Sequence, residues 1–244
     1  GFHPMVYSEG IENWPKNFLW FQEMFEKHGI PWTSIYLLEV RNVEWTKQQV
    51  LDFMKFIEFL IEWAWDKVGR DYQRYKEFLF RQSGFNILSA PLSIIGRGLG
   101  CSIQGTFMLR LGDLAIVPCH RIMYAGNETA QLKVHNGKIV GVTAKNPELM
   151  IGVYSADVKY APYCEGCPIN TVCSLGCLGS QLETTGDMFA PIPTVCELEH
   201  AKVLAMIRAY KRIGIYNTLI SEIDKTKRDA FLLVEKLYEE GSRR

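Results

Sequence analysis

Seven cysteines are the residues of this 244-residue chain whose types and spacing most clearly predict chemistry. Four of them fall within the segment CEGCPINTVCSLGC, at spacings C-x2-C-x5-C-x3-C, and one more follows after a further eighteen residues. The dense run comprises Cys164, Cys167, Cys173 and Cys177, the later cysteine is Cys196, and the two upstream cysteines are Cys101 and Cys119. Thiols at this density are typical of a site held by disulfide bonds, by zinc or by iron–sulfur clusters.

Iron–sulfur chemistry is the interpretation that the count and the spacing favour most. Disulfides are disfavoured because seven is odd, the chain is long enough to bury a core, and no segment resembles a signal peptide. Zinc stays open, although structural zinc sites usually pair two short knuckles and only one C-x2-C occurs. Iron–sulfur clusters take four thiolates, and a close run can send its last cysteine to a second cluster. Seven cysteines therefore suit two clusters, one with four ligands and one with three.

The arrangement around these residues resembles the seven-cysteine pattern of SPASM domains. The first half reads Cys101-x10-Gly112-x6-Cys119, whereas the family more often has four residues between the glycine and the second cysteine. The second half, from the dense run to Cys196, fits without adjustment, and the resemblance covers roughly residues 95–200. SPASM domains form the C-terminal part of many radical S-adenosylmethionine enzymes, notably those that modify ribosomally made peptides.

The resemblance implies a ligand set for two [4Fe–4S] clusters. The distal cluster would be held by Cys164, Cys167, Cys173 and Cys196. The proximal cluster would be held by Cys101, Cys119 and Cys177. Cys177 would therefore serve a different cluster from its neighbours in the run. His120 is a candidate for the fourth ligand of the proximal cluster, but we favour an ordinary surface or supporting histidine at that position.

The chain lacks the C-x3-C-x2-C triplet that holds the cofactor-cleaving cluster of radical S-adenosylmethionine enzymes. We expect either a fragment of a longer enzyme or a chain that works with a separate polypeptide, and this chain alone should not cleave the cofactor. S-adenosylmethionine and a third [4Fe–4S] cluster would belong to the complete parent enzyme. The resemblance implies a peptide substrate and an external electron donor. The two auxiliary clusters would relay electrons, and the proximal one could also bind substrate. A stand-alone electron-transfer or peptide-binding subunit is a further alternative.

Composition excludes some classes of partner. The chain has 27 Lys and Arg against 27 Asp and Glu, so its formal net charge is zero. This balance gives no electrostatic reason to expect nucleic-acid or membrane binding. The most apolar stretch, residues 53–65, is interrupted by Lys55, Glu58 and Glu62 at helical spacing. It predicts an amphipathic helix rather than a membrane span, and we expect a cytoplasmic protein.

The first third of the chain has the pattern of an α/β protein. Pro15 favours a helix start, and Thr46 with Gln49 forms a capping-box pair. The predicted elements are a helix from Asn13 to Gly29, a buried strand at 33–40, helices at 46–68 and 71–82, and a last strand at 85–95. This order resembles the back part of a radical S-adenosylmethionine partial barrel.

Three polar residues follow the predicted strand at 33–40. Glu39, Arg41 and Asn42 would lie at the carboxyl end of a barrel strand, where catalytic and cofactor-binding residues gather. Arg41 has the geometry to bind a carboxylate of cofactor or peptide in a bidentate pair. An internal Glu39–Arg41 pair, or capping of the next helix, is slightly favoured over this role.

The rest of the chain changes to short strands and then to helices. Two hairpins are predicted, one around residues 111–113 and one around Asn136-Gly137, which is the strongest short hairpin signal. Helices are predicted to start at Asn146 and to span 195–213 and 220–240, with Phe231, Leu232, Val234 and Leu237 as core residues of the last one. The expected fold is α+β: a C-terminal part of the partial (β/α) barrel at 1–95, a SPASM domain with β-hairpins and a cysteine-rich loop at 96–213, and a C-terminal helix and tail at 214–244.

Overall fold

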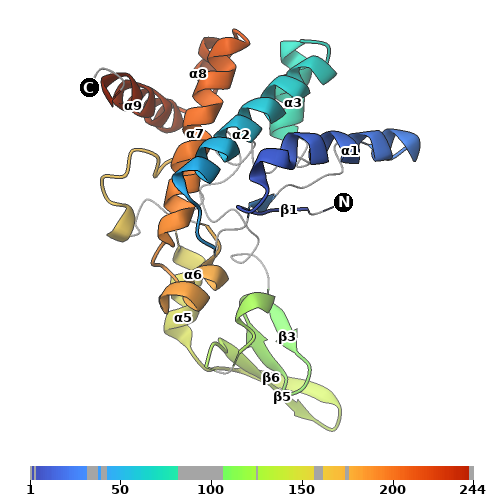
Figure 1. Ribbon diagram of the computed structural model, residues 1–244. Helices are drawn as coiled ribbons and strands as arrows, with labels where there is room; N and C mark the ends of the chain where they lie inside the picture. Colours follow the sequence, from blue (N-terminus) through green and yellow to red (C-terminus); the bar gives the residue numbers. More distant parts are fainter. Residues whose placement is uncertain are drawn as a thin grey trace. The chain divides into compact units, whose positions relative to one another are not determined.

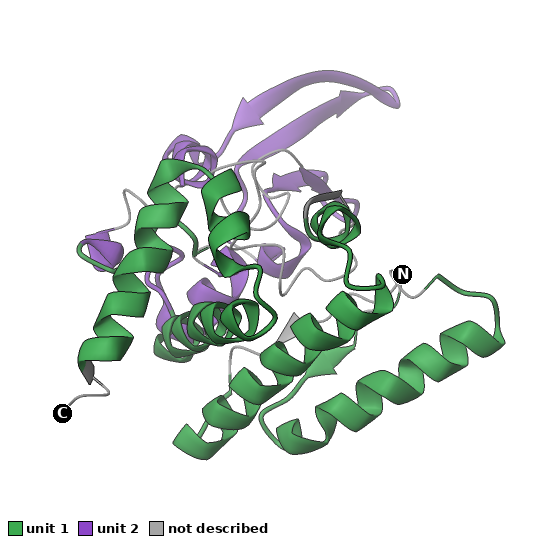
Figure 2. Cartoon of the chain, turned by 90° about the horizontal axis from the view of Figure 1, so that it is seen from above, with its two compact units in different colours: residues 1–96, 166–173, 192–244 green, residues 97–165, 174–191 purple. Residues whose placement is uncertain are grey.

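The computed structural model of the chain describes residues 2, 4–31, 38–39, 43–81, 107–124, 126–156, 162–173 and 176–241. Two compact units are present, and each combines separate stretches of sequence (Figure 2). Unit 1 comprises Gly1–Gly96, Gly166–Cys173 and Ile192–Arg244, and unit 2 comprises Arg97–Glu165 and Ser174–Pro191. Cys101, Arg41, Asn42, the predicted strand at 85–95 and most of that at 33–40 lie outside the described residues. The division into functional parts at 1–95, 96–213 and 214–244 stays a prediction. The two compact units are defined by contacts between residues and do not test what each part does.

Helices dominate unit 1 (Figure 1). Its elements are β1 (Met5–Val6), η1 (Ile11–Asn13), α1 (Trp14–Lys27), β2 (Leu38–Glu39), α2 (Lys47–Lys67), α3 (Tyr72–Arg81), α7 (Pro193–Arg212), α8 (Tyr216–Glu222) and α9 (Lys225–Gly241). Strands β1 and β2 pair in parallel, with Val6 opposite Glu39. The helices predicted near 13–29, 46–68, 71–82 and 195–213 are confirmed.

Helix α2 is the best example of a sequence signal realised in the fold. The side chain of Thr46 accepts a hydrogen bond from the Gln49 amide, and the Gln49 side chain accepts one from the Thr46 amide, so the predicted capping box is present. Helix α2 packs along α7, the most extensive helix–helix contact among the described residues. Glu58 of α2 is 7% exposed and forms ion pairs with Arg208 and Arg212 of α7. The charge that interrupts the apolar stretch thus has paired cations on the neighbouring helix.

The C-terminal region differs from its prediction. A single helix was expected at 220–240, whereas α8 ends at Glu222 and α9 begins at Lys225. Ile223 between them is extended, and the Asp224 carboxylate accepts a hydrogen bond from the Lys227 amide, which starts α9 separately. Of the apolar residues expected in the core, Phe231 and Val234 are buried, but Leu232 and Leu237 are 45% and 49% exposed.

Unit 2 is built around a four-stranded antiparallel sheet in the order β3-β4-β5-β6. The strands are β3 (Met108–Arg110), β4 (Ala115–Val117), β5 (Ala130–His135) and β6 (Lys138–Ala144). Both predicted hairpins are confirmed where they are described. Asn136 and Gly137 have φ values of 48° and 74° between β5 and β6, the left-handed conformations that a tight two-residue turn requires.

The remaining elements of unit 2 are short helices, three of which contain or directly follow a cysteine. They are η5 (His120–Ile122), α5 (Pro147–Ser155), η7 (Pro162–Cys164) and α6 (Leu178–Thr185). The predicted start of α5 is confirmed, since the Asn146 side chain accepts a hydrogen bond from the Leu149 amide. The described residues therefore form an α+β protein. Among them, no helix combines the length and the apolar character that crossing a bilayer requires.

Candidate metal centre

The division into two compact units passes through the cysteine run itself. Unit 1 contains Cys167, Cys173 and Cys196, whereas unit 2 contains Cys119, Cys164 and Cys177. The thiols of Cys119, Cys167, Cys177 and Cys196 are free. Cys173 and Cys177, separated by three residues in the sequence, thus belong to different units.

In unit 2, Cys119 and Cys177 each stand immediately before a short helix. Cys119 is the N-cap of η5, and its sulfur accepts a hydrogen bond from the Arg121 amide at 3.4 Å. Cys177 is the N-cap of α6, with its carbonyl accepting from the Gln181 amide at 2.9 Å. Amide hydrogen bonds to sulfur stabilise a thiolate and tune any metal that it binds.

Arg121 links these two cysteines electrostatically. Burial acts to lower the pKa of its guanidinium, but the carboxylate of Glu183 and the sulfurs of Cys177 and Cys119 outweigh burial and raise that pKa above the usual value. The Arg121 Nε donates to Glu183 at 2.9 Å. One cation therefore lies within electrostatic reach of both thiols of unit 2.

A glycine makes this proximity possible. A Cβ added at Gly179, in the first turn of α6, would lie 3.0 Å from both Cβ and Cγ of Arg121. The Cβ is fixed by the backbone and cannot swing away, so only glycine lets α6 approach η5 this closely. Gly176, with φ of 86°, turns the chain just before Cys177. Gly176 thus serves a tight turn and Gly179 a close approach next to the cysteine run.

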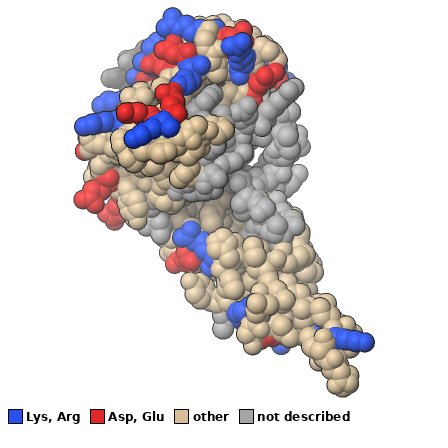
Figure 3. Space-filling model, turned by 90° about the vertical axis from the view of Figure 1, so that its right-hand side faces the viewer, with Lys and Arg blue, Asp and Glu red and all other residues tan. Residues whose placement is uncertain are grey.

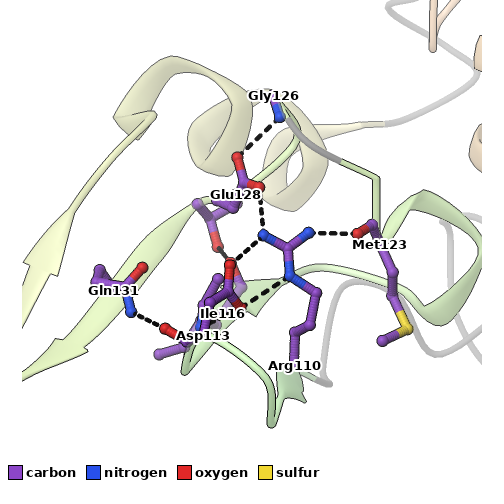
Figure 4. Close-up of polar contacts among 9 residues, drawn as sticks. Arg110, Asp113, Ile116, Met123, Gly126, Glu128 and Gln131 are labelled. Carbon is purple, nitrogen blue, oxygen red and sulfur yellow. Dashed lines mark hydrogen bonds and ion pairs between the residues drawn. The ribbon is translucent and has the colours of Figure 1, made fainter.

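A polar network holds the loop that carries Cys119. Figure 4 shows the Arg110 guanidinium directed at Asp113 and Glu128 and at the carbonyl of Met123. The Arg110 Nε lies 2.9 Å from Asp113, and the other carboxylate oxygen of Glu128 accepts from the Gly126 amide at 2.9 Å. Hydrogen bonding to Arg110 lowers the pKa of Asp113 to about 2 and also lowers that of Glu128. The network ties β3 to the end of η5, the helix that Cys119 caps.

In unit 1, Cys167 and Cys173 flank a turn that is anchored to the core. Ile169 and Val172, which lie between them, are 1% and 4% exposed and belong to the main core cluster. The Cys173 amide donates to the Ile169 carbonyl at 2.9 Å, and the hydroxyl of Thr171 donates to the Thr226 carbonyl at 3.1 Å. Two buried side chains therefore fix the turn while its cysteines remain partly accessible.

Helix α7 places Cys196 and His200 on one face, one turn apart. His200 Nε2 lies 3.5 Å from the sulfur of Cys167. Burial raises the pKa of the Cys196 thiol, and the nearby Cys167 and Glu199 raise it further, although the residue as a whole is exposed. Burial lowers the pKa of His200 while Glu199 opposes that shift. The sulfur of Cys167 thus lies close to His200, and Cys196 lies within electrostatic reach of Cys167.

A buried ion pair lies in α7, the helix that also carries Cys196 and His200. Lys202 Nζ donates to Glu199 at 2.9 Å, and both side chains are 2% exposed. Buried ions persist only when they are paired, so the ammonium of Lys202 offsets the carboxylate beside Cys196 and His200.

The remaining predicted site residues fall in different places. Cys164 ends η7 of unit 2, and Glu39 lies in β2 of unit 1. His120 Nδ1 lies 3.8 Å from the sulfur of Cys119, next to it in sequence. In the part of the chain that the structure describes, no three His, Cys, Asp or Glu side chains are grouped closely enough to hold a metal ion. Cys119 and Cys177 thus share Arg121, and Cys196 lies within electrostatic reach of Cys167.

The sequence prediction did not include Arg121 or His200. A signal for His200 was present, since it follows Cys196 by four residues in a predicted helix and therefore shares its face. Arg121 gave no comparable signal, because its relation to Cys177 depends on the packing of α6 against η5. Comparison of the chain with models of protein families, with curated proteins and with solved structures found no match.

Proposed function

We propose that the chain binds two [4Fe–4S] clusters and is the auxiliary-cluster part of a radical S-adenosylmethionine enzyme that modifies peptides. Under this proposal the distal cluster is held by Cys164, Cys167, Cys173 and Cys196. The proximal cluster is held by Cys101, Cys119 and Cys177. The SPASM fold, the partial barrel and the cytoplasmic location belong to the proposal and rest on the resemblance of the cysteine pattern.

The cation shared by Cys177 and Cys119 is the observation that carries this proposal. Arg121 is within electrostatic reach of Cys177 and Cys119, and Cys196 is within reach of Cys167. These are the partners that the two-cluster ligand set requires.

The chemistry of the donor set also supports the proposal. Thiolates with amide hydrogen bonds to sulfur are the usual protein environment of iron–sulfur clusters, which when bound accept and release single electrons. In unit 2 the Arg121 amide and guanidinium offset negative charge at Cys119 and Cys177. In unit 1 His200 is positioned to donate a hydrogen bond to Cys167. Glu39, Arg41 and Asn42 remain proposed cofactor contacts, and an external donor would supply electrons.

Metal and sulfide analysis of the full chain tests the proposal. After anaerobic purification or reconstitution, we expect about eight irons and eight sulfides per chain, the content of two [4Fe–4S] clusters. Stoichiometric zinc without iron would contradict the proposal. Reconstitution needs only iron and inorganic sulfide, so the test does not require the peptide substrate to be known.

A single zinc ion in unit 1 is a second candidate, favoured by one distance. Two ligands of a tetrahedral zinc, with Zn–S of about 2.3 Å and Zn–N of about 2.0 Å, lie about 3.5 Å apart. The sulfur of Cys167 and Nε2 of His200 are 3.5 Å apart. Zinc held by Cys167 and His200 would connect the anchored turn to α7 and act structurally.

One variant separates the two candidates. His200→Gln keeps a hydrogen-bond donor but replaces the imidazole ligand, so a cluster bound only by cysteines should keep its iron. A zinc site that uses the imidazole should lose most of its metal, because a ligand has been removed. Metal content, measured for the variant and for the parent chain under the same conditions, distinguishes these outcomes.

A further inference from the structure

The β5–β6 hairpin of unit 2 has two chemically different faces. Leu132 lies opposite Val142, and Val134 lies opposite Ile139, so one face is apolar. The other face carries Lys133 and, in register with one another, His135 and Lys138. Between Lys133 and Val134 the register shifts, which leaves Val140 as an extra residue on β6.

The apolar face is exposed. Val134, Ile139 and Val142 are 44%, 66% and 58% exposed, and the bulged Val140 is 63% exposed. Isolated apolar residues are common on protein surfaces, but neighbouring ones on one strand pair form a surface that a partner can cover. In Figure 3 the hairpin shows mainly uncharged surface, with Lys and Arg atoms near its tip.

Strand β6 is also an edge strand. It ends the sheet order β3-β4-β5-β6, so among the described residues only one of its sides is paired. Proteins usually protect such edges with charges, prolines or bulges; β6 has Lys138 at its start and the bulge at Val140, but residues 139–144, IVGVTA, contain no charge and no proline. Backbone groups on this side are therefore suited to pair with an added strand.

The charge of the hairpin indicates which kind of strand could pair with β6. Residues 130–145 contain three lysines, Lys133, Lys138 and Lys145, and no aspartate or glutamate. A second copy of the same hairpin would bring like charges together, which opposes self-association. An extended segment that alternates acidic and apolar residues would place carboxylates near Lys138 and apolar side chains against Ile139 and Val142.

We propose that the edge of β6 binds an extended segment of another polypeptide, with alternating acidic and apolar residues, by strand addition. Main-chain hydrogen bonds would provide affinity, and the two faces of the hairpin would fix the register and the side-chain preference. This proposal does not depend on metal content. Strand addition can therefore fail while the two-cluster proposal holds, and the two-cluster proposal can fail while strand addition holds.

The test uses the full chain and a fluorescent octapeptide of alternating Glu and Val. We expect saturable binding, and we expect amide hydrogen exchange in β6 to slow in the complex. The same peptide with Lys in place of Glu should bind about tenfold more weakly, because its charge matches that of the hairpin. Two further peptides carry methyl groups on alternate backbone nitrogens, one at the Glu positions and one at the Val positions. Only one of them should lose binding, because only alternate amides of an added strand face β6, and this loss identifies main-chain pairing.

Variants locate the site. Lys138→Glu should weaken binding of the acidic peptide about tenfold and strengthen that of the lysine peptide. Lys16→Glu, the same charge change on an exposed position of α1, is the matched control and should leave both affinities unchanged. Equal binding of the two peptides, no protection of β6, or an equal loss in both variants would overturn the proposal. So would concentration-dependent self-association that Lys138→Glu abolishes, since the occupant would then be a second copy.

Discussion

The thiols of unit 2 and those of unit 1 have opposite electrostatic surroundings. Cys119 and Cys177 share a cation, Arg121, and Cys119 also receives a backbone amide. Cys196 instead has Cys167 and a buried carboxylate as neighbours, and burial and those two groups raise the pKa of its thiol. The protein itself thus offsets negative charge in unit 2, whereas in unit 1 a metal must displace a more tightly held proton.

This difference implies different properties for the two proposed clusters. A cation beside a cluster favours its reduced, more negative state, so the cluster of unit 2 should be reduced at the higher potential. Metal binding in unit 1 should depend on pH, because the proton of Cys196 has to leave and its pKa is raised.

Removing the buried cation of α7 should have the largest effect, and it should affect unit 1. Lys202→Met leaves the Glu199 carboxylate at a 2% exposed position without the ammonium 2.9 Å away. Loss of one partner of a buried pair typically costs about 3–5 kcal/mol. Urea denaturation should show this loss, and the double variant Glu199→Gln/Lys202→Met should recover most of it. A loss below about 1 kcal/mol would contradict the prediction.

Filling the close contact between α6 and η5 should be next, and it affects unit 2. Gly179→Ala places a methyl group 3.0 Å from Cβ and Cγ of Arg121, and overpacking of this kind costs about 1–3 kcal/mol. We expect reduced stability and easier loss of metal from Cys119 and Cys177. Gly112→Ala in the same unit is the matched control, because an added Cβ there meets no atom within 4 Å. Equal effects of the two substitutions would show that the close approach is unimportant.

Two substitutions should shift cluster potentials selectively. Arg121→Gln should lower the potential of the unit 2 cluster by about 60 mV, which corresponds to a tenfold change in a one-electron equilibrium. His200→Ala should lower the potential of the unit 1 cluster by a similar or smaller amount, because it removes a hydrogen bond to sulfur. Redox titration followed by electron paramagnetic resonance measures both. If both variants shift the reduction potential of the same cluster, the proposed difference between the two units is wrong.

The smallest effect should concern acid stability in unit 2. The pKa of Asp113 falls from 3.8 to about 2 in the folded chain, mainly through its hydrogen bond to Arg110. The stabilisation from this group is present above about pH 4 and is lost as the pH falls through about 2, since protonation breaks the pair. Asp113→Asn should therefore flatten the dependence of urea midpoints on pH in this range. An unchanged slope would contradict this role.

Local signals in the sequence account for much of the fold. The capping box at Thr46 and Gln49 and the Asn136-Gly137 turn act within a few residues, so their elements are predicted nearly to the observed bounds. The break at Ile223 was missed because the apolar pattern continues across it. Helix α6 was missed because Cys177 gives no ordinary capping signal, and no side chain caps that helix.

The candidate site could be predicted only in part for the same reason. The spacing of the cysteines identifies the ligand type, and the resemblance assigns Cys177 to Cys119 rather than to Cys173. The surroundings of the two pairs depend on contacts over long sequence separations, such as Cys167 with His200 and Arg121 with Glu183. Composition and periodicity do not contain that information.

The assignment of Cys177 is tested most directly by comparing single cysteine variants after anaerobic reconstitution. We predict that Cys177→Ser loses the same electron paramagnetic resonance signal as Cys119→Ser, the signal whose potential Arg121→Gln shifts. Cys173→Ser and Cys196→Ser should lose the other signal and keep this one. If Cys177→Ser and Cys173→Ser abolish the same signal while Cys119→Ser keeps it, the run closes a single site and the two-cluster assignment is wrong.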